Sequence, residues 1–582
     1  MISYNRRLQP LAILFGAAFT VAVCLSCGTL LLRDSCTDPG VRFVAGGAIL
    51  SAGVFALCAV GLAYPAVFLL LGTGVIVSGR RWGKRPQLFE SRWWWLAFGP
   101  FLVLYLANAM APEISYDGSR YHLGLVGRYF REHGFQPVRD NFYAALSQGV
   151  EMLYLYAYAF GRHSAAAMAH FAFLLALTWQ MISWSRRAGL PFAGVCAAFL
   201  VFASPVVGVD GTSAYNDVAV AAIAFTLFYL LDAWEARPSQ RLLIAIGITA
   251  GFAYAAKYTA AVAVPYAIGV VAWRSRRWQA VAIVAGCAAA IALPWILKDW
   301  IWFRNPVAPF FNRLFPNPYI TSSFEADYMH NMQLYSLASR WAIPLQVTVQ
   351  GSLAGLLGPV FLLSPLALLA LVWREGRRLL LAAGVFGIIY FFNISTRFLI
   401  PALPFVALAL CLVLARQPRI AVLVVAIHAV LSWPDVVKRY CRFDAWHLMK
   451  VPYREALRIK PEDGYLESNL PLYGAVRLIE RSTPSGSTIF AQTPIPEAYT
   501  SRHIQIGFQA EPNIRSRETL WRSFDGPVAA RLQAARELKQ RGIDYLLIMD
   551  GEYGADVLRQ NLTDWSMQEV GNYKGARLYQ LP

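Results

Sequence analysis

The candidate chemistry of this sequence begins with a carboxylate just beyond an apolar stretch of chain. Asp117 follows the apolar run 93–111 by only a few residues. If that run crosses a bilayer, Asp117 stands at headgroup level, where a carboxylate is well placed to act on a lipid-borne substrate. A structural role is the alternative, because Asp is a favoured N-cap of a helix. Further polar side chains flank it in the segment APEISYDGSRYH: Glu113, Arg120, Tyr121 and His122.

A second acid lies at the start of another apolar run. Asp217 ends the segment DGTSAYND, which begins at Asp210 and leads into the run 214–236. A carboxylate at the mouth of a membrane helix is costly unless it is paired or functional. Two explanations therefore stand for Asp217, a functional role and the capping of that helix.

Four cations form the third set of candidates. Several cations that face outward at one level would suit a phosphate or diphosphate group. The alternative for the two that adjoin apolar runs is that their charged ends extend to the interface while their stems stay in the bilayer. The four are Lys257 and Arg397, which adjoin apolar runs, and Arg304 and Arg340, which lie in the polar segment 298–343.

The composition indicates what kind of protein must position these residues. Of 582 residues, 57% are hydrophobic and 15% are charged, whereas a soluble domain has about 25% charged residues. A soluble enzyme, a disordered scaffold and a DNA-binding domain are all poor matches to this composition. The sequence therefore predicts a polytopic α-helical membrane protein.

Apolar runs of about 20 residues mark the spans. The run 43–79 is too long for one straight span, so it is tilted or broken near Pro65. The sequence predicts about 13 spans, which lie near 11–32, 43–79, 93–111, 164–184, 190–209, 214–236, 240–257, 260–273, 278–297, 344–372, 379–395, 398–416 and 418–436.

The basic residues give the expected orientation. Alternate connections are rich in Arg and Lys, and the positive-inside rule places such connections in the cytoplasm. Much of the net charge of +18 then reflects topology, and no nucleic-acid partner is expected. The N-terminus is predicted to be cytoplasmic and the C-terminal region extracytoplasmic. The basic connections contain Arg6–Arg7, Arg80–Arg85, Arg186–Arg187, Arg237–Arg241, Arg274–Arg277, Arg374–Arg378 and Arg416–Arg419.

The remaining pieces are expected on the outer side. Residues 118–134 and 139–161 are amphipathic and aromatic, which predicts helices in the interface plane. The tail 437–582 alternates strand-like and helix-like segments, which indicates a small α/β domain. Within it we expect strands at 487–492, 503–508 and 543–549 and a helix at 526–542.

An ordered series of short motifs resembles a known family. The chain is similar to the GT-C glycosyltransferases that use lipid carriers, the class that contains protein O-mannosyltransferases and aminoarabinose transferases. The similarity covers about residues 93–436, which would be the catalytic module, with outer loops 112–163 and 298–343. Residues 1–80 form N-terminal spans outside the shared region. The motifs are Tyr116–His122, Gln148–Tyr154, Tyr215–Asp217, Ala256–Thr259, Trp300–Pro306 with Pro309–Phe311, and Arg397–Pro401.

This resemblance implies an inverting transfer of a sugar from a polyprenyl-phosphate carrier to an acceptor hydroxyl. Asp117 would be the general base, and the cations named above would bind the donor phosphate. The other active-site candidates are Glu113, Tyr121, His122, Asp217 and Tyr258. The acceptor would be a lipid, a glycan or a protein, and the enzyme would lie in a bacterial inner membrane with the tail in the periplasm. The alternatives are a ligase or polymerase of O-antigen or other polysaccharide, and a transporter of lipid-linked glycans.

The metal requirement stays open at this point. Many members of the resembled class carry a second acid directly after the catalytic Asp, where this chain has Gly118. Either no cofactor is required, or Mg²⁺ or Mn²⁺ is held by oxygens of Asp117, Asp217 and Glu113.

Overall fold

The computed structural model describes residues 9–80, 94–332, 339–391 and 394–582. The basic residues Arg6, Arg7, Arg81, Lys84 and Arg85 lie outside the described residues. The chain forms two compact units. The first, called here the helical unit, contains Met1–Glu113, Ser147–Pro294 and Met332–Ile459. The second, the α/β unit, contains Ile114–Leu146, Trp295–Asn331 and Lys460–Pro582.

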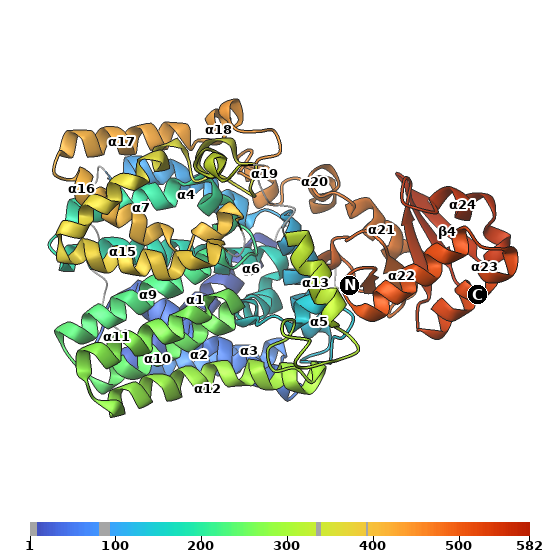
Figure 1. Cartoon of the computed structure of the whole chain (residues 1–582), viewed down its shortest axis with the longest axis horizontal. Helices are drawn as coiled ribbons and strands as arrows, with labels where there is room; N and C mark the ends of the chain where they lie inside the picture. Colours follow the sequence, from blue (N-terminus) through green and yellow to red (C-terminus); the bar gives the residue numbers. More distant parts are fainter. Residues whose placement is uncertain (1–8, 81–93, 333–338, 392–393) are drawn as a thin grey trace. The chain divides into compact units, whose positions relative to one another are not determined.

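The helical unit is built almost entirely of helices (Figure 1). Helices α1, α2 and α6 pack against one another, and α6 also contacts α7 and α9. The longer helices are α1 (Gln9–Leu32), α2 (Pro39–Ala59), α3 (Pro65–Gly79), α4 (Trp94–Met110), α6 (Gly149–Arg187), α7 (Pro191–Ala203), α9 (Asp217–Ala236), α10 (Gln240–Ala256), α11 (Ala263–Ser275), α12 (Trp278–Phe303), α15 (Arg374–Gly387), α16 (Leu403–Leu414) and α17 (Pro418–Leu431). Shorter elements are α8 (Pro205–Gly211), η4 (Tyr258–Val262), η6 (Arg340–Ala342), α14 (Ile343–Leu345), η7 (Gln346–Gln350), η8 (Pro359–Val372), η9 (Ile388–Phe391), η10 (Thr396–Leu399), α18 (Pro434–Tyr440) and α19 (Tyr453–Ala456).

The helix lengths agree with a multi-pass membrane protein. Among the described residues, five helices are long and apolar enough to cross a membrane, two bent helix pairs pass the same test, and five shorter helices are apolar. The predicted number of about 13 spans stays a prediction. The predicted break near Pro65 is confirmed, because α2 ends at Ala59 and α3 begins at Pro65, where proline suits the first turn of a helix.

That break changes the direction of the chain. Gly28 lies close to Arg42 and Gly46 close to Cys24, which shows that α1 and α2 are antiparallel. In α3, Gly72 lies close to Phe19 and Gly79 close to Ser26, both in α1. Helix α3 therefore runs parallel to α1 and antiparallel to α2. Residues 43–79 cross the helical unit twice, where the sequence scheme counted one tilted or broken span.

The N-terminal end of α1 differs from the sequence scheme as a result. At its other end, Arg241 Nη1 donates to Leu31 O at 3.2 Å, so the connection after α1 lies beside the connection 237–241. The sequence predicted that the start of the first span and the connection 237–241 lie on the same face. The contact of Arg241 with the end of α1 contradicts this prediction. The physical reason is that residues 43–79 form two antiparallel helices, α2 and α3, where one span was predicted. One extra crossing reverses the direction in which α1 must run.

The segment 149–161 is also different from its prediction as part of an interfacial helix. It forms the first part of α6, with a break at Arg162 (φ 58°), and most of its side chains are buried in the helical unit. Tyr156 Oη donates to Phe68 O at 2.7 Å, and Ser51 Oγ donates to Gly149 O at 2.7 Å. Tyr156 and Phe160 contact Phe19 of α1, and Tyr154 contacts His170 within the unit, so this segment packs inside the helical unit.

The α/β unit contains a five-stranded mixed sheet in the order β2-β1-β3-β5-β4. Strands β2, β1 and β3 are parallel, and β5 pairs antiparallel with both β3 and β4. Its strands are β1 (Thr488–Ala491), β2 (His503–Ile506), β3 (Tyr545–Met549), β4 (Gln568–Tyr573) and β5 (Ala576–Gln580). Its helices and turns are η2 (Gly118–His122), α5 (Leu123–Arg131), η3 (Phe142–Ala145), α13 (Ser322–Met332), α20 (Glu462–Asn469), α21 (Tyr473–Ser482), η11 (Glu497–Tyr499), α22 (Glu511–Phe524), α23 (Val528–Gln540), α24 (Ala555–Gln560) and η12 (Leu562–Trp565).

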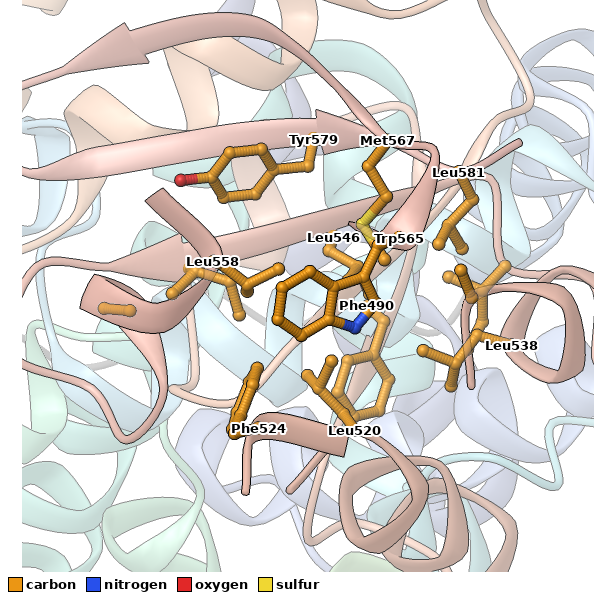
Figure 2. Close-up of a cluster of buried hydrophobic side chains, with 14 residues drawn as sticks. Phe490, Leu520, Phe524, Leu538, Leu546, Leu558, Trp565, Met567, Tyr579 and Leu581 are labelled. Atoms are coloured by element: carbon orange, nitrogen blue, oxygen red, sulfur yellow. The ribbon is translucent and has the colours of Figure 1, made fainter. Parts of the chain in front are cut away.

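Alternating side chains of the strands build a core on each face of the sheet. On one face, Figure 2 shows Trp565 among Phe490, Leu546 and Tyr579 of the strands and side chains of α22, α23 and α24. On the other face, the neighbours of those strand residues, such as Ile489 and Leu547, pack with α21. This period of two is what a sheet covered by helices on both faces requires.

The predicted elements of the tail are confirmed, but the unit is larger than the tail. Strands β1, β2 and β3 and helix α23 match the four expected segments. The α/β unit starts at Lys460 rather than 437, and it also includes 114–146 and 295–331. The expected interfacial helix at 118–134 is α5, whose Leu123, Leu125 and Val126 are buried in protein.

Candidate active site

The helical unit brings together one buried acid and two cations from three separate segments. Asp217 is the first residue of α9, and its side chain is only 1% exposed. Lys257 Nζ forms an ion pair with Asp217 Oδ1, and Arg397 Nε lies 4.0 Å from Asp217 Oδ2. The predicted Asp217, Lys257 and Arg397 are therefore neighbours in the fold.

The backbone around each residue explains this convergence. Lys257 follows the last turn of α10 in an extended conformation (φ −160°), and Arg397 lies in η10. The capping role considered for Asp217 belongs to another residue, since Asp210 Oδ1 accepts a hydrogen bond from Val218 N at 2.8 Å. A carboxylate at a helix N-terminus is also favoured by the helix dipole.

Aromatic rings line the two cations. The Phe398 ring lies 4.6 Å from Lys257 Nζ and 5.3 Å from the Arg397 guanidinium carbon. The guanidinium carbon is also 5.4 Å from the centroid of the Tyr215 ring. Lys257 and Arg397 side chains are 19% and 23% exposed. Both cations are thus directed at a buried carboxylate and at ring faces, which disfavours the alternative that they only extend to the interface.

Further buried polar residues surround the start of α9. Glu113 Oε2 accepts a hydrogen bond from Ala214 N at 2.7 Å, so this candidate holds the loop before Asp217. Glu151 Oε1 accepts from Asn216 Nδ2 at 3.4 Å. Glu113 and Glu151 are 4% and 2% exposed. Two candidate motifs far apart in sequence therefore meet at one loop.

His170 completes this support from α6. Its Nδ1 lies 2.7 Å from Ser213 O, and its Nε2 accepts from Ala219 N at 3.3 Å, which assigns the neutral tautomer with the proton on Nδ1. Asp210, Glu151 and His170 were not among the predicted site residues. Asp210 and Glu151 stand inside the quoted segments, whereas nothing in the apolar surroundings of His170 marks it.

Asp117 belongs to the α/β unit. It directly precedes the π-helical turn η2, and within the described part of the chain its side chain makes no capping hydrogen bond to that turn. The capping explanation for Asp117 is therefore not supported. Behind it, Arg120 stacks 3.6 Å from the centroid of the Tyr116 ring and donates to Tyr116 O at 3.2 Å.

The other residues of this turn are held by aromatic stacking. Tyr121 stacks on Tyr143 with ring centroids 3.9 Å apart, and its ring centroid is 4.3 Å from that of His122. His122 is 4% exposed. Tyr121 and His122 thus form a stacked group that fixes the turn directly after Asp117.

The remaining candidates are Tyr258, Arg304 and Arg340. Tyr258 begins η4, and its ring centroid is 5.9 Å from that of Tyr254. Arg304 and Arg340 are exposed. Within the described ranges, no three His, Cys, Asp or Glu side chains gather in a way that would hold a metal ion.

Comparison with solved structures identifies the fold. The crystal structure of ArnT from Cupriavidus metallidurans bound to undecaprenyl phosphate matches with a TM-score of 0.51 and 14% identity, covering 84% of this chain and 98% of that one. The apo state of the same protein matches with a TM-score of 0.51 and 13% identity, covering 84% and 97%. The expected resemblance is confirmed as a likeness of fold to ArnT.

Sequence comparison gives a family without an assigned activity. No curated protein matches the chain. A family model described as a domain of unknown function, DUF8201, matches residues 11–352. This match begins in α1, so it includes the N-terminal helices that the motif series leaves out. Because it spans more than half of the sequence, the chain belongs to the DUF8201 family.

Proposed function

We propose that this protein is an inverting membrane glycosyltransferase that moves a sugar from a polyprenyl-phosphate carrier to an acceptor hydroxyl. The observation that carries the proposal is the pairing of Lys257 and Arg397 with the buried Asp217. Two cations held beside ring faces form a site for the phosphate of such a donor. The fold supports this, since the similar ArnT was solved with undecaprenyl phosphate bound.

The chemistry follows from where charge develops. When the bond between the anomeric carbon and the phosphate oxygen breaks, the electron pair goes to the phosphate, and Lys257 and Arg397 stabilise the added charge. The acceptor oxygen attacks from the opposite face of the sugar, and Asp117 takes its proton as general base. In the absence of donor, Asp217 balances the two cations. The two cations supply the charge stabilisation that Mg²⁺ or Mn²⁺ would otherwise provide.

The same proposal gives the protein a place and an orientation. We assign it to a bacterial inner membrane, with the α/β unit in the periplasm and the basic connections in the cytoplasm. The connection after α1 lies beside 237–241, so that connection is also cytoplasmic. The N-terminal end of α1 is then extracytoplasmic, opposite to the orientation expected from Arg6–Arg7.

Release of polyprenyl phosphate by the purified protein tests this function. Polyprenyl-phosphate hexoses and pentoses are offered together with extracted envelope lipids, glycans and proteins as acceptors. Wild type should release polyprenyl phosphate and label one acceptor class, and Asp117→Asn should slow transfer by about 10²–10⁴-fold. Asp435→Asn is the matched control, because Asp435 is an exposed carboxylate paired with Lys438. Unchanged turnover in Asp117→Asn would remove the general-base assignment, and block transfer of long glycans would favour a ligase or polymerase.

A further inference from the structure

The segment that carries Asp117 is bound along its length by residues of the C-terminal part of the α/β unit. Before α5, Arg120 Nε donates to Pro494 O at 3.4 Å. At the end of α5, Arg131 Nη1 donates to Thr500 O at 3.3 Å. The segment 494–500, which lies between β1 and β2, therefore contacts both the turn before α5 and the last residue of α5.

The middle of α5 is equally close to the same segment. A Cβ placed on Gly124 would lie 3.0 Å from Glu497 Cβ and 3.5 Å from its Oε2. Only a residue without a side chain leaves this spacing undisturbed, so α5 and η11 pack at nearly backbone distance. Burial, together with the charge of Asp140, raises the pKa of Glu497 to about 8, so a neutral carboxyl group faces α5 at neutral pH.

A side-chain contact with β2 completes the attachment beyond α5. His503, the first residue of the edge strand β2, contacts Asp140 through its Nε2. Arg128 Nη1 lies 3.6 Å from Asp140 Oδ1, and Arg128 Nε lies 3.0 Å from Glu132. Burial alone would raise the pKa of Asp140, but His503 and Arg128 hold that pKa below its ordinary value. Asp140 is therefore an anion in a cationic surrounding.

Residues 509–513, which follow β2 and begin α22, also bind the backbone of the loops 112–163 and 298–343. Asn513 Nδ2 donates to Asp140 O at 2.8 Å, and Phe142 N donates to Gln509 O at 2.9 Å. In the second loop, Glu511 N donates to Tyr319 O at 2.8 Å. The stretch from β2 to the start of α22 thus holds two loops that are far apart in sequence.

From these contacts we infer that the Asp140–His503 pair and the 494–500 segment position Asp117 for the transfer reaction. This inference rests on the proposed function and adds to it a role for the C-terminal domain. His503 and Asp140 are positioning residues: they act through the segment 118–140 and touch no reacting atom. Because the attachment fixes the start of η2, its loss displaces the general base while the donor-binding cations in the helical unit keep their partners.

Steady-state kinetics of the full-length protein test the inference. In His503→Gln and Asp140→Asn, kcat should fall about 10- to 100-fold, as expected for a misplaced catalytic group, with the KM for donor unchanged. In an Asp117→Asn background, His503→Gln should have no further effect on kcat, because the group it positions has been removed. Arg522→Gln is the control, since it breaks an exposed ion pair with Glu518 in α22.

Hydrogen exchange of residues 118–131 gives a readout that is independent of activity. Faster exchange in His503→Gln with lowered kcat supports the inference. Faster exchange with unchanged kcat, or an additive loss in the Asp117→Asn background, would overturn it while the proposed function stands. A wild-type protein that transfers no sugar would overturn the proposed function and this inference with it.

Discussion

The cation pair makes the sharpest prediction, which concerns binding of the carrier phosphate. Lys257→Gln removes one charged donor from the site and leaves Asp217 with Arg397 at 4.0 Å. A hydrogen bond between charged groups contributes about 1.5–3 kcal/mol, and about 1.4 kcal/mol corresponds to a factor of ten. We therefore expect Lys257→Gln to weaken binding of undecaprenyl phosphate by about 10- to 100-fold.

Asp217→Asn should have the opposite effect on affinity. The carboxylate competes with the phosphate for the same two cations, and two unit charges about 4 Å apart interact by roughly 4 kcal/mol at an effective dielectric constant near 20. Part of this attraction is released to the ligand when Asp217 becomes neutral, so undecaprenyl phosphate should bind more tightly. The same variant should melt at a lower temperature, because it leaves the partly buried Lys257 without its anionic partner.

Titration of undecaprenyl phosphate into the detergent-solubilised protein, followed by intrinsic tryptophan fluorescence, measures both effects. Lys438→Gln is the control, because Lys438 is 49% exposed and pairs with the exposed Asp435. Equal affinity of wild type and Lys257→Gln would show that the phosphate binds elsewhere. Loss of binding in folded Asp217→Asn would show that the carboxylate orients the cations rather than competing with the ligand.

Three further predictions address the pH dependence, the packing and the orientation. The pKa of Glu497 is raised from 4.5 to about 8, so the protonated carboxyl group stabilises the fold fully below pH 4.5, and this contribution is lost as the pH rises through about 8. Glu497→Gln should therefore flatten the fall in Tm between pH 6 and pH 9, and an unchanged slope would contradict this. Gly28→Ala should lower Tm, because its Cβ would lie 1.9 Å from Arg42 O, whereas Gly53→Ala, with nothing within 4 Å, should leave Tm almost unchanged; equal Tm values in both variants would refute the close packing. A cysteine at Gln9, at the start of α1, should react with an impermeant maleimide in intact cells, and protection there with reaction only after lysis would reverse the proposed orientation.

Local sequence patterns were sufficient where one segment carries the whole signal. The apolar runs predicted the membrane class, Pro65 predicted the break between α2 and α3, and short strand-like segments predicted β1, β2 and β3. The hairpin of β4 and β5 was missed, although Lys574 and Gly575 both have positive φ, as the tight turns of hairpins require. Its strands are partly polar, and they are specified mainly by the pairing of β5 with β3 and with β4.

Residues that adjoin an apolar surface were harder to predict, because lipid and protein present the same chemistry to a side chain. The segment 149–161 resembles an interfacial helix by composition, and its burial depends on the packing of α1 and α3 against it. The predicted orientation of α1 was wrong for a related reason, because a long apolar run has the same composition whether it crosses the unit once or twice.

The candidate site shows the same division between local chemistry and long-range geometry. Residue type and position beside apolar runs were enough to select Asp117, Asp217, Lys257 and Arg397. The ion pair of Asp217 with Lys257 joins residues 40 positions apart and depends on how α9 packs against α10. The capping of α9 by Asp210 and the support from His170 depend on the same packing. A sequence specifies which groups are costly to bury alone, and the packed helices determine which partner each of them meets.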